Sequence, residues 1–120
     1  MALHEQDGSL DRLEQELNRL HRSIRLSIQG YLKPFEGTCY ATLKENQSAA
    51  STIHQLLDRY GLRIRCPECG NPAILRVSAR KNANAGVFVF DHSVKGKRTF
   101  HGGRGVFPFM RLVEKPRRKP

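Results

Sequence analysis

The chain has 120 residues, a formal net charge of +10, 38% hydrophobic residues and three cysteines. This length allows one domain, or one small domain with an appendage, and only a modest core. No stretch approaches the length of a membrane span and residues 1–7 are too polar for a signal peptide, so we expect a reducing, cytoplasmic compartment and no membrane partner.

Two helices are predicted in residues 1–60. The first covers about residues 9–29, with Ser9 as its N-cap and Gly30 as its stop. Its apolar residues follow a 3-4-3-4 spacing, which is a coiled-coil seam of just over two heptads. The seam consists of Leu10, Leu13, Leu17, Leu20 and Ile24. It predicts contact with a second copy, with another protein or with the second helix of the same chain.

The second helix is predicted at about residues 47–60, with Asn46 or Ser48 as its N-cap. The connector at residues 30–45 contains Cys39. A lone cysteine is most often a small buried apolar side chain, and we expect the same of Cys39.

From residue 61 the pattern changes from helical to alternating, which predicts an antiparallel β module at residues 61–113. The expected strands lie at residues 62–65, 73–78, 87–90 and 98–101, with a loop at residues 80–86. Residues 106–113 form an edge strand at best, because Pro108 lacks an N–H donor. Residues 114–120 are expected to be a disordered basic tail. The predicted fold class is therefore α+β: two N-terminal helices, then a small antiparallel β module.

The sequence Cys66-Pro67-Glu68-Cys69-Gly70 carries the strongest chemical signal. Two cysteines two residues apart, with proline between them and glycine after them, form a tight turn that directs both sulfurs to one point. In a reducing compartment such a pair indicates a metal ion held by thiolates, and we predict Zn²⁺. A redox-active dithiol is the alternative, but it needs a helix starting at Cys66, which Gly70 and Pro72 oppose.

Structural zinc takes four ligands, so two more are needed. The candidates are His92, His101, Cys39, Asp91 and a residue of a second subunit. A hairpin turn centred on residues 96–97 would place His92 directly opposite His101, with β-carbons about 5 Å apart.

The predicted metal site is therefore Cys66, Cys69, His92 and His101. In the alternative, the two histidines bind no metal and are surface residues of a basic, nucleic-acid-contacting hairpin.

Residues 62–103 resemble a zinc ribbon, a family in which two knuckles on adjacent hairpins hold one zinc ion. The resemblance rests on strand, Cys66-Pro67-Glu68-Cys69-Gly70, strand and a second hairpin, while the usual second cysteine pair is absent. It implies a metal-stapled β module that contacts nucleic acid or protein, and it implies no catalysis. Phe90-Asp91-His92 is also similar to the opening of an HNH nuclease, which implies metal-assisted hydrolysis. No asparagine or histidine follows His101 to complete that motif.

The positive charge lies mainly at the C-terminal end, where residues 95–120 contain nine basic side chains and one acidic one. Such asymmetry favours an anionic partner, with nucleic acid first, an acidic membrane surface second, and a merely solubilising tail as the alternative. The predicted nucleic-acid-binding residues are Arg63, Arg65, Arg76, Arg80, Lys81, Lys95, Lys97, Arg98, Arg104, Arg117, Arg118 and Lys119. Phe100, Phe107 and Phe109 lie among them, and core packing is favoured over base stacking for each.

The predicted function is non-catalytic binding of DNA or RNA, mainly through the phosphate backbone, with zinc holding the β module. The leading alternative is a protein–protein adaptor, or a small subunit of a larger complex, that uses the leucine seam. An HNH-like nuclease is a further alternative.

Overall fold

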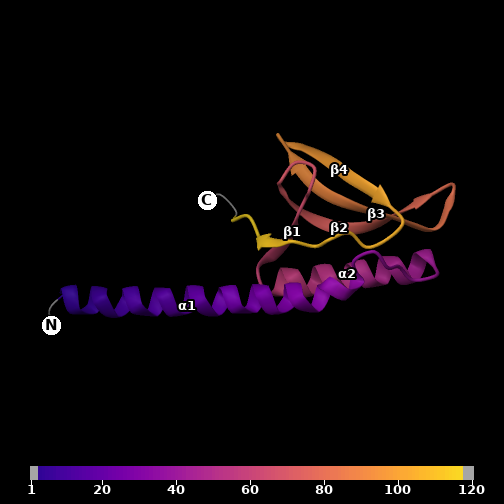
Figure 1. Cartoon of the computed structure of the whole chain (residues 1–120). Coiled ribbons are helices and arrows are strands. Elements are labelled where there is room, and N and C mark those ends of the chain that lie inside the picture. The colour runs from indigo at the N-terminus through magenta and orange to yellow at the C-terminus, as the bar shows by residue number, and fades with distance from the viewer. Residues whose placement is uncertain (1–2, 118–120) are drawn as a thin grey trace.

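The computed structural model describes residues 3–117, and the side chains of residues 8–117. Its elements are α1 (Leu3–Leu32), the 3-10 helix η1 (Lys33–Phe35), α2 (Leu43–Arg59), β1 (Leu62–Arg65), β2 (Pro72–Arg80), β3 (Ala83–Val94), β4 (Lys97–Arg104) and β5 (Leu112–Glu114). This order confirms the α+β fold, with two N-terminal helices followed by a five-stranded antiparallel sheet (Figure 1). None of the helices in the described part of the chain combines the length and apolarity needed to cross a bilayer.

Helix α1 is longer than predicted at both ends. It begins before Ser9 and continues through Gly30, because glycine costs a helix only about 1 kcal/mol and tertiary contacts lie beyond it. Leu32 is buried, and the Gln29 side-chain oxygen accepts a hydrogen bond from the Leu112 N–H at 3.1 Å. A helix of 30 residues is about 45 Å long. Its N-terminal part therefore extends well past the sheet (Figure 1).

Helix α2 begins four residues earlier than predicted. Thr42 is its N-cap, and the side-chain oxygen of Thr42 accepts the N–H three residues later at 3.2 Å. The predicted caps Asn46 and Ser48 lie inside the helix. Asn46 is fully buried, where its side chain bonds both backbone groups of Tyr40 and the carbonyl of Ala85. Asn46 thus links the connector to β3 rather than capping the helix.

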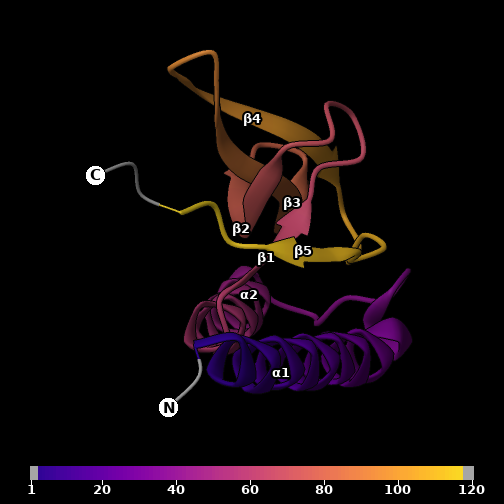
Figure 2. The same ribbon diagram turned by 90° about the vertical axis from the view of Figure 1, so that its left-hand side faces the viewer.

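The strands lie in the order β4-β3-β2-β1-β5, and every neighbouring pair is antiparallel. Both helices lie on one side of the sheet (Figure 2), and the core between them joins Leu57 of α2 to Ile64, Leu75 and Phe88 of the strands. The predicted boundary at residue 60 falls between α2 and β1, two elements that share this core. Strand β5 is at the sheet edge, and the predicted loop at residues 80–86 shortens to a two-residue turn.

The β3–β4 hairpin turns one residue earlier than predicted. Lys95 and Gly96 have φ angles of 52° and 78°, the combination of the two-residue turn whose twist matches its strands. The register pairs His92 with Thr99 and Phe90 with His101, so the predicted direct pairing of the two histidines is wrong. Because the pairing changes by two residues, both histidines still project from the same face of the sheet.

The segment after β4 folds back over the connector between the helices. Phe107 exchanges two backbone hydrogen bonds with it, one to Gly37 and one to Thr38, at 2.9 and 2.8 Å. Farther on, the Lys115 N–H donates to the Gly61 carbonyl at 2.8 Å. The beginning of the tail at residues 114–120, expected to be disordered, is therefore attached to the sheet. Arg118 and Lys119 lie outside the described residues.

Candidate metal centre

The turn between β1 and β2 holds Cys66 and Cys69. The Gly70 N–H donates to the Cys66 carbonyl at 2.7 Å, and the Cys66 N–H donates to the Asn71 carbonyl at 2.8 Å. Gly70 has a φ angle of 78°, a conformation that residues with a side chain rarely adopt. These two bonds and the glycine close the turn at residues 66–70 that the Cys-Pro-Glu-Cys-Gly sequence predicts. This turn is the knuckle of the metal centre.

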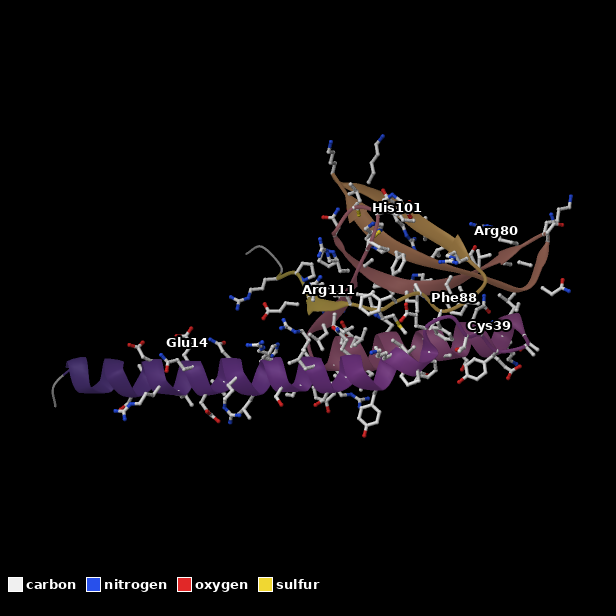
Figure 3. The ribbon with its side chains drawn as sticks, viewed as in Figure 1. Glu14, Cys39, Arg80, Phe88, His101 and Arg111 are labelled. Atoms are coloured by element: carbon white, nitrogen blue, oxygen red, sulfur yellow. The ribbon has the colours of Figure 1, made fainter. Side chains whose placement is uncertain are left out.

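His92 and His101 come from the β3–β4 hairpin. Side chains alternate along a strand, so His92 projects from the same face as Phe88 and Phe90. His101 is paired with Phe90 in the register and shares this face. Phe88, Phe90 and Cys66 all belong to the core cluster. The metal centre therefore lies at the end of the core (His101 is labelled in Figure 3).

The ligand atoms of the four side chains all lie within 4.8 Å of one another. The Cys66 Sγ atom is 3.3 Å from His101 Nδ1, and the Cys69 Sγ atom is 3.0 Å from His92 Nε2. In a tetrahedral zinc site with bonds of roughly 2.0–2.3 Å, ligand atoms are about 3.5 Å apart. The structure thus brings the four predicted ligands together in a Cys2His2 group that could hold a metal ion.

Neighbouring polar groups orient the candidate ligands. The carbonyl of Thr99 lies 2.9 Å from His92 Nδ1, and because a carbonyl only accepts, Nδ1 carries the proton and Nε2 is free to bind a metal. The Asn71 side-chain amide donates to the Cys69 sulfur at 3.3 Å. Thr99 is the register partner of His92, so the hairpin pairing that positions this ring also fixes its tautomer.

The two thiols differ in their acidity. Burial raises the pKa of Cys66, which is fully enclosed. Burial also raises the pKa of Cys69, but hydrogen bonds from the backbone and the side chain of Asn71 oppose this effect, and the pKa of Cys69 lies below its ordinary value. Because metals bind the thiolate, the environment of Cys69 favours the form that a metal requires.

The other two candidate ligands lie outside the cluster. Cys39 is exposed, so the expectation that it is buried is wrong. Asp91 projects from the opposite face of β3 to His92, and its carboxylate bonds Arg76 at 2.5 Å and Arg98 at 2.8 Å. The hydrogen bond from Arg98 lowers the pKa of Asp91 against the opposing effect of burial, and Arg76 adds to this lowering. Asp91 is therefore an ion-pair residue of the outer face.

The predicted nucleic-acid-binding residues occupy different environments. Arg63 is largely enclosed and pairs with Asp58 at 3.0 Å, and Arg76 and Arg98 are paired with Asp91. The remaining described members are all exposed: Arg65, Arg80, Lys81, Lys95, Lys97, Arg104 and Arg117. They do not form one continuous patch, because the two turns that carry residues 80–81 and residues 95–97 lie at opposite ends of β3 (Figure 1).

The three phenylalanines among the basic residues also differ. Phe107 is buried as predicted, with its ring centroid 4.3 Å from that of Phe88. Phe100 and Phe109 are each 51% exposed, so the expectation of core packing is wrong for both. Arg111 is exposed and was missed, although the density of basic residues after residue 95 was a signal for it.

The leucine seam of α1 is exposed to solvent. Leu10, Leu13, Leu17, Leu20 and Ile24 are between 39% and 61% exposed. Packing of the seam on α2 of the same chain, one of its predicted uses, is therefore wrong. Toward the C-terminal end of α1 this face continues at Ile28 and Leu32, and these two residues do pack in the core.

Comparison with protein-family models, with the curated proteins and with solved structures gives no match for this chain. Conclusions about function consequently depend on the residues of the site and its surroundings.

Proposed function

We propose that the protein is a non-catalytic nucleic-acid-binding protein whose β module is held by a structural zinc ion. The observation that carries this proposal is a group of three exposed arginines beside the Cys2His2 group: Arg65, Arg104 and Arg111. Among the described side chains, residues 8–117, none of the three forms an ion pair with a carboxylate. Their charge is therefore available to an anionic partner.

Zinc suits the donor set. Two thiolates and two imidazoles are ligands of intermediate softness, and a set of four protein ligands closes a tetrahedral site. The zinc-ribbon resemblance supports this proposal, since one knuckle and the neighbouring hairpin supply the four ligands. A closed site leaves no coordination position for a substrate, which favours a structural role over a nuclease.

Phosphate is the group that these arginines fit best. A guanidinium group donates two parallel hydrogen bonds to phosphate oxygens, and its charge persists at every physiological pH. The net charge of +10 would add a long-range attraction to any polyanion.

Salt dependence tests this proposal on the full chain. With three to five phosphate contacts, affinity for a single strand is expected to fall roughly 20- to 100-fold between about 50 and 200 mM salt. Fluorescence anisotropy with a labelled oligonucleotide measures this fall. An affinity that hardly changes over this range would contradict the electrostatic basis of the proposal.

A second candidate function is a protein–protein contact through the exposed seam of α1, and the partner that fits best is a second copy. The described first half of the helix is net acidic, with Asp11, Glu14 and Glu16 against one basic residue, Arg12. Its second half carries Arg19, Arg22 and Arg25. An antiparallel pair of helices places each acidic half beside a basic half, and a parallel pair places like charges together. We therefore favour an antiparallel pair joined along the seam.

The change Leu17→Glu, at the middle of the seam, is expected to convert such a dimer to a monomer in sedimentation equilibrium, because it buries a charge in the interface. Leu26→Glu is the matched control, since Leu26 is 52% exposed and Leu17 54%, but Leu26 lies off the seam. A monomeric parent protein, or equal effects of both changes, would contradict the dimer.

A further inference from the structure

A cleft of about 740 Å³ lies against the metal centre. One wall is the knuckle, at Pro67 and Glu68, and another is the end of β4 at residues 102–104. The segment at residues 106–111 closes the remaining side, and Phe88 lies in the floor. Phe88 and Arg111, both labelled in Figure 3, are two of the residues that line this space. Its volume is in the range of roughly 300–1,000 Å³ that small-molecule sites occupy.

The polar groups of the cleft are of both signs. Arg65, Arg104 and Arg111 supply three guanidinium groups, and Glu36 and Glu68 supply two carboxylates. One oxygen of Glu68 accepts a hydrogen bond from the Gly102 N–H at 2.7 Å. A ligand that fits must therefore combine negative charge with hydrogen-bond donors, as a nucleotide does through its phosphate and its amino or hydroxyl groups.

The cleft also has a flat apolar wall. Phe109 is 51% exposed although its neighbours Phe107 and Met110 are buried, so its ring stands at the cleft surface. Exposed aromatic rings are the usual stacking surface for unpaired bases. Phosphate binding alone does not require an exposed aromatic ring beside the arginines. The ring of Phe109 therefore favours a ligand that has a base as well as a phosphate.

The end of β4 leaves backbone accessible at the cleft. The register between β3 and β4 shifts at Phe88 and Val89, which places Gly103 in a bulge. Gly103 is exposed, and a β-carbon added there would meet nothing within 4 Å, so the space on that side of its backbone is open. A ligand phosphate or sugar can approach it closely.

We infer that this cleft binds one unpaired nucleotide of a single strand, with its base on Phe109 and its phosphates at Arg65, Arg104 and Arg111. The inference rests on the proposed function and adds a preference to it. In a duplex the bases are paired and stacked on one another, so they cannot reach Phe109. The protein thus binds single strands more tightly than duplexes of the same sequence.

The test compares Phe109→Ala with Phe100→Ala in the full, zinc-loaded chain. The two phenylalanines are equally exposed, but Phe100 lies on the outer face, beneath Arg98, and outside the cleft. Affinities for a labelled single strand and for its duplex are measured by anisotropy. Phe109→Ala is expected to lower single-strand affinity roughly 5-fold or more and to leave duplex affinity unchanged, whereas Phe100→Ala changes neither.

Equal single-strand affinities of the two variants would contradict nucleotide binding in the cleft while leaving the proposed function intact. A parent protein that binds neither single strand nor duplex would overturn both. If Phe109→Ala fails to retain its zinc, the same affinities are measured for Arg104→Gln and Arg80→Gln instead. Both arginines are exposed, but only Arg104 lines the cleft. A selective loss of single-strand affinity in Arg104→Gln supports the cleft, and equal losses in both variants overturn it.

Discussion

Replacing Cys66 with serine is expected to abolish zinc binding and to lower the free energy of unfolding by about 4 kcal/mol. This is the stabilisation that a ligand provides when its free concentration is about a thousand times its dissociation constant. Cys66 is fully buried between the core and His101, so a serine hydroxyl there is both a poor zinc ligand and a polar group in the core. Elemental analysis and urea denaturation measure the two effects.

Cys39→Ser is the matched control for this prediction. Cys39 is exposed and lies outside the Cys2His2 group, so its replacement is expected to change neither zinc content nor stability. Strand β4 should respond most to the loss of Cys66, because it is an edge strand paired only with β3 and contacts the knuckle through His101 and Gly102. Hydrogen exchange in β4 that is the same in both variants would contradict a metal-stapled hairpin.

Removing the three arginines of the cleft together is expected to have the largest effect on nucleic-acid binding. The combination Arg65→Gln, Arg104→Gln and Arg111→Gln should lower single-strand affinity about 100-fold at low salt, at roughly 1 kcal/mol per phosphate contact. The slope of log affinity against log salt should decrease by about 2, because each lost contact contributes about 0.7 for a single strand. Anisotropy titrations at several salt concentrations measure both quantities.

An equal change of charge elsewhere is the control. Arg12, Lys44 and Arg59 are exposed on the two helices and do not line the cleft, and their replacement by glutamine removes the same number of charges. We expect only a small, salt-sensitive loss of affinity, because long-range attraction alone is reduced. If the two triple variants lost affinity equally, net charge would explain binding and the cleft would have no special role.

Local sequence patterns predicted the knuckle and the order of the elements correctly. The turn at residues 66–70 depends on a few neighbouring residues, and the strands depend on alternation, so both can be read from short windows. The prediction placed His92 and His101 correctly on one face of the sheet, although the register from which it was made was wrong by two residues. The turn moved by one residue, the pairing moved by two, and the parity that decides which face a side chain occupies was unchanged.

Features that depend on distant contacts could not be predicted in this way. Gly30 is a natural helix stop, but the helix continues because Leu32 is buried against the sheet. The cleft exists because Phe107 pairs with Gly37 and Thr38, about seventy positions earlier in the chain. No local sequence pattern indicates that Phe107 pairs with this distant segment. The exposure of Phe109 and the place of Arg111 in the cleft therefore could not be predicted from the sequence.

The claim that a metal ion holds the nucleic-acid-binding surface is tested most directly by measuring single-strand affinity in three states of one preparation: zinc-loaded, chelated and reloaded with zinc. The hydrogen bond between Glu68 and Gly102 joins the knuckle to the cleft wall, so loss of the ion should leave that wall disordered. Affinity is expected to fall about 10-fold on chelation, the cost of ordering one or two side chains on binding, and to recover on reloading. The same affinity in all three states would contradict the account.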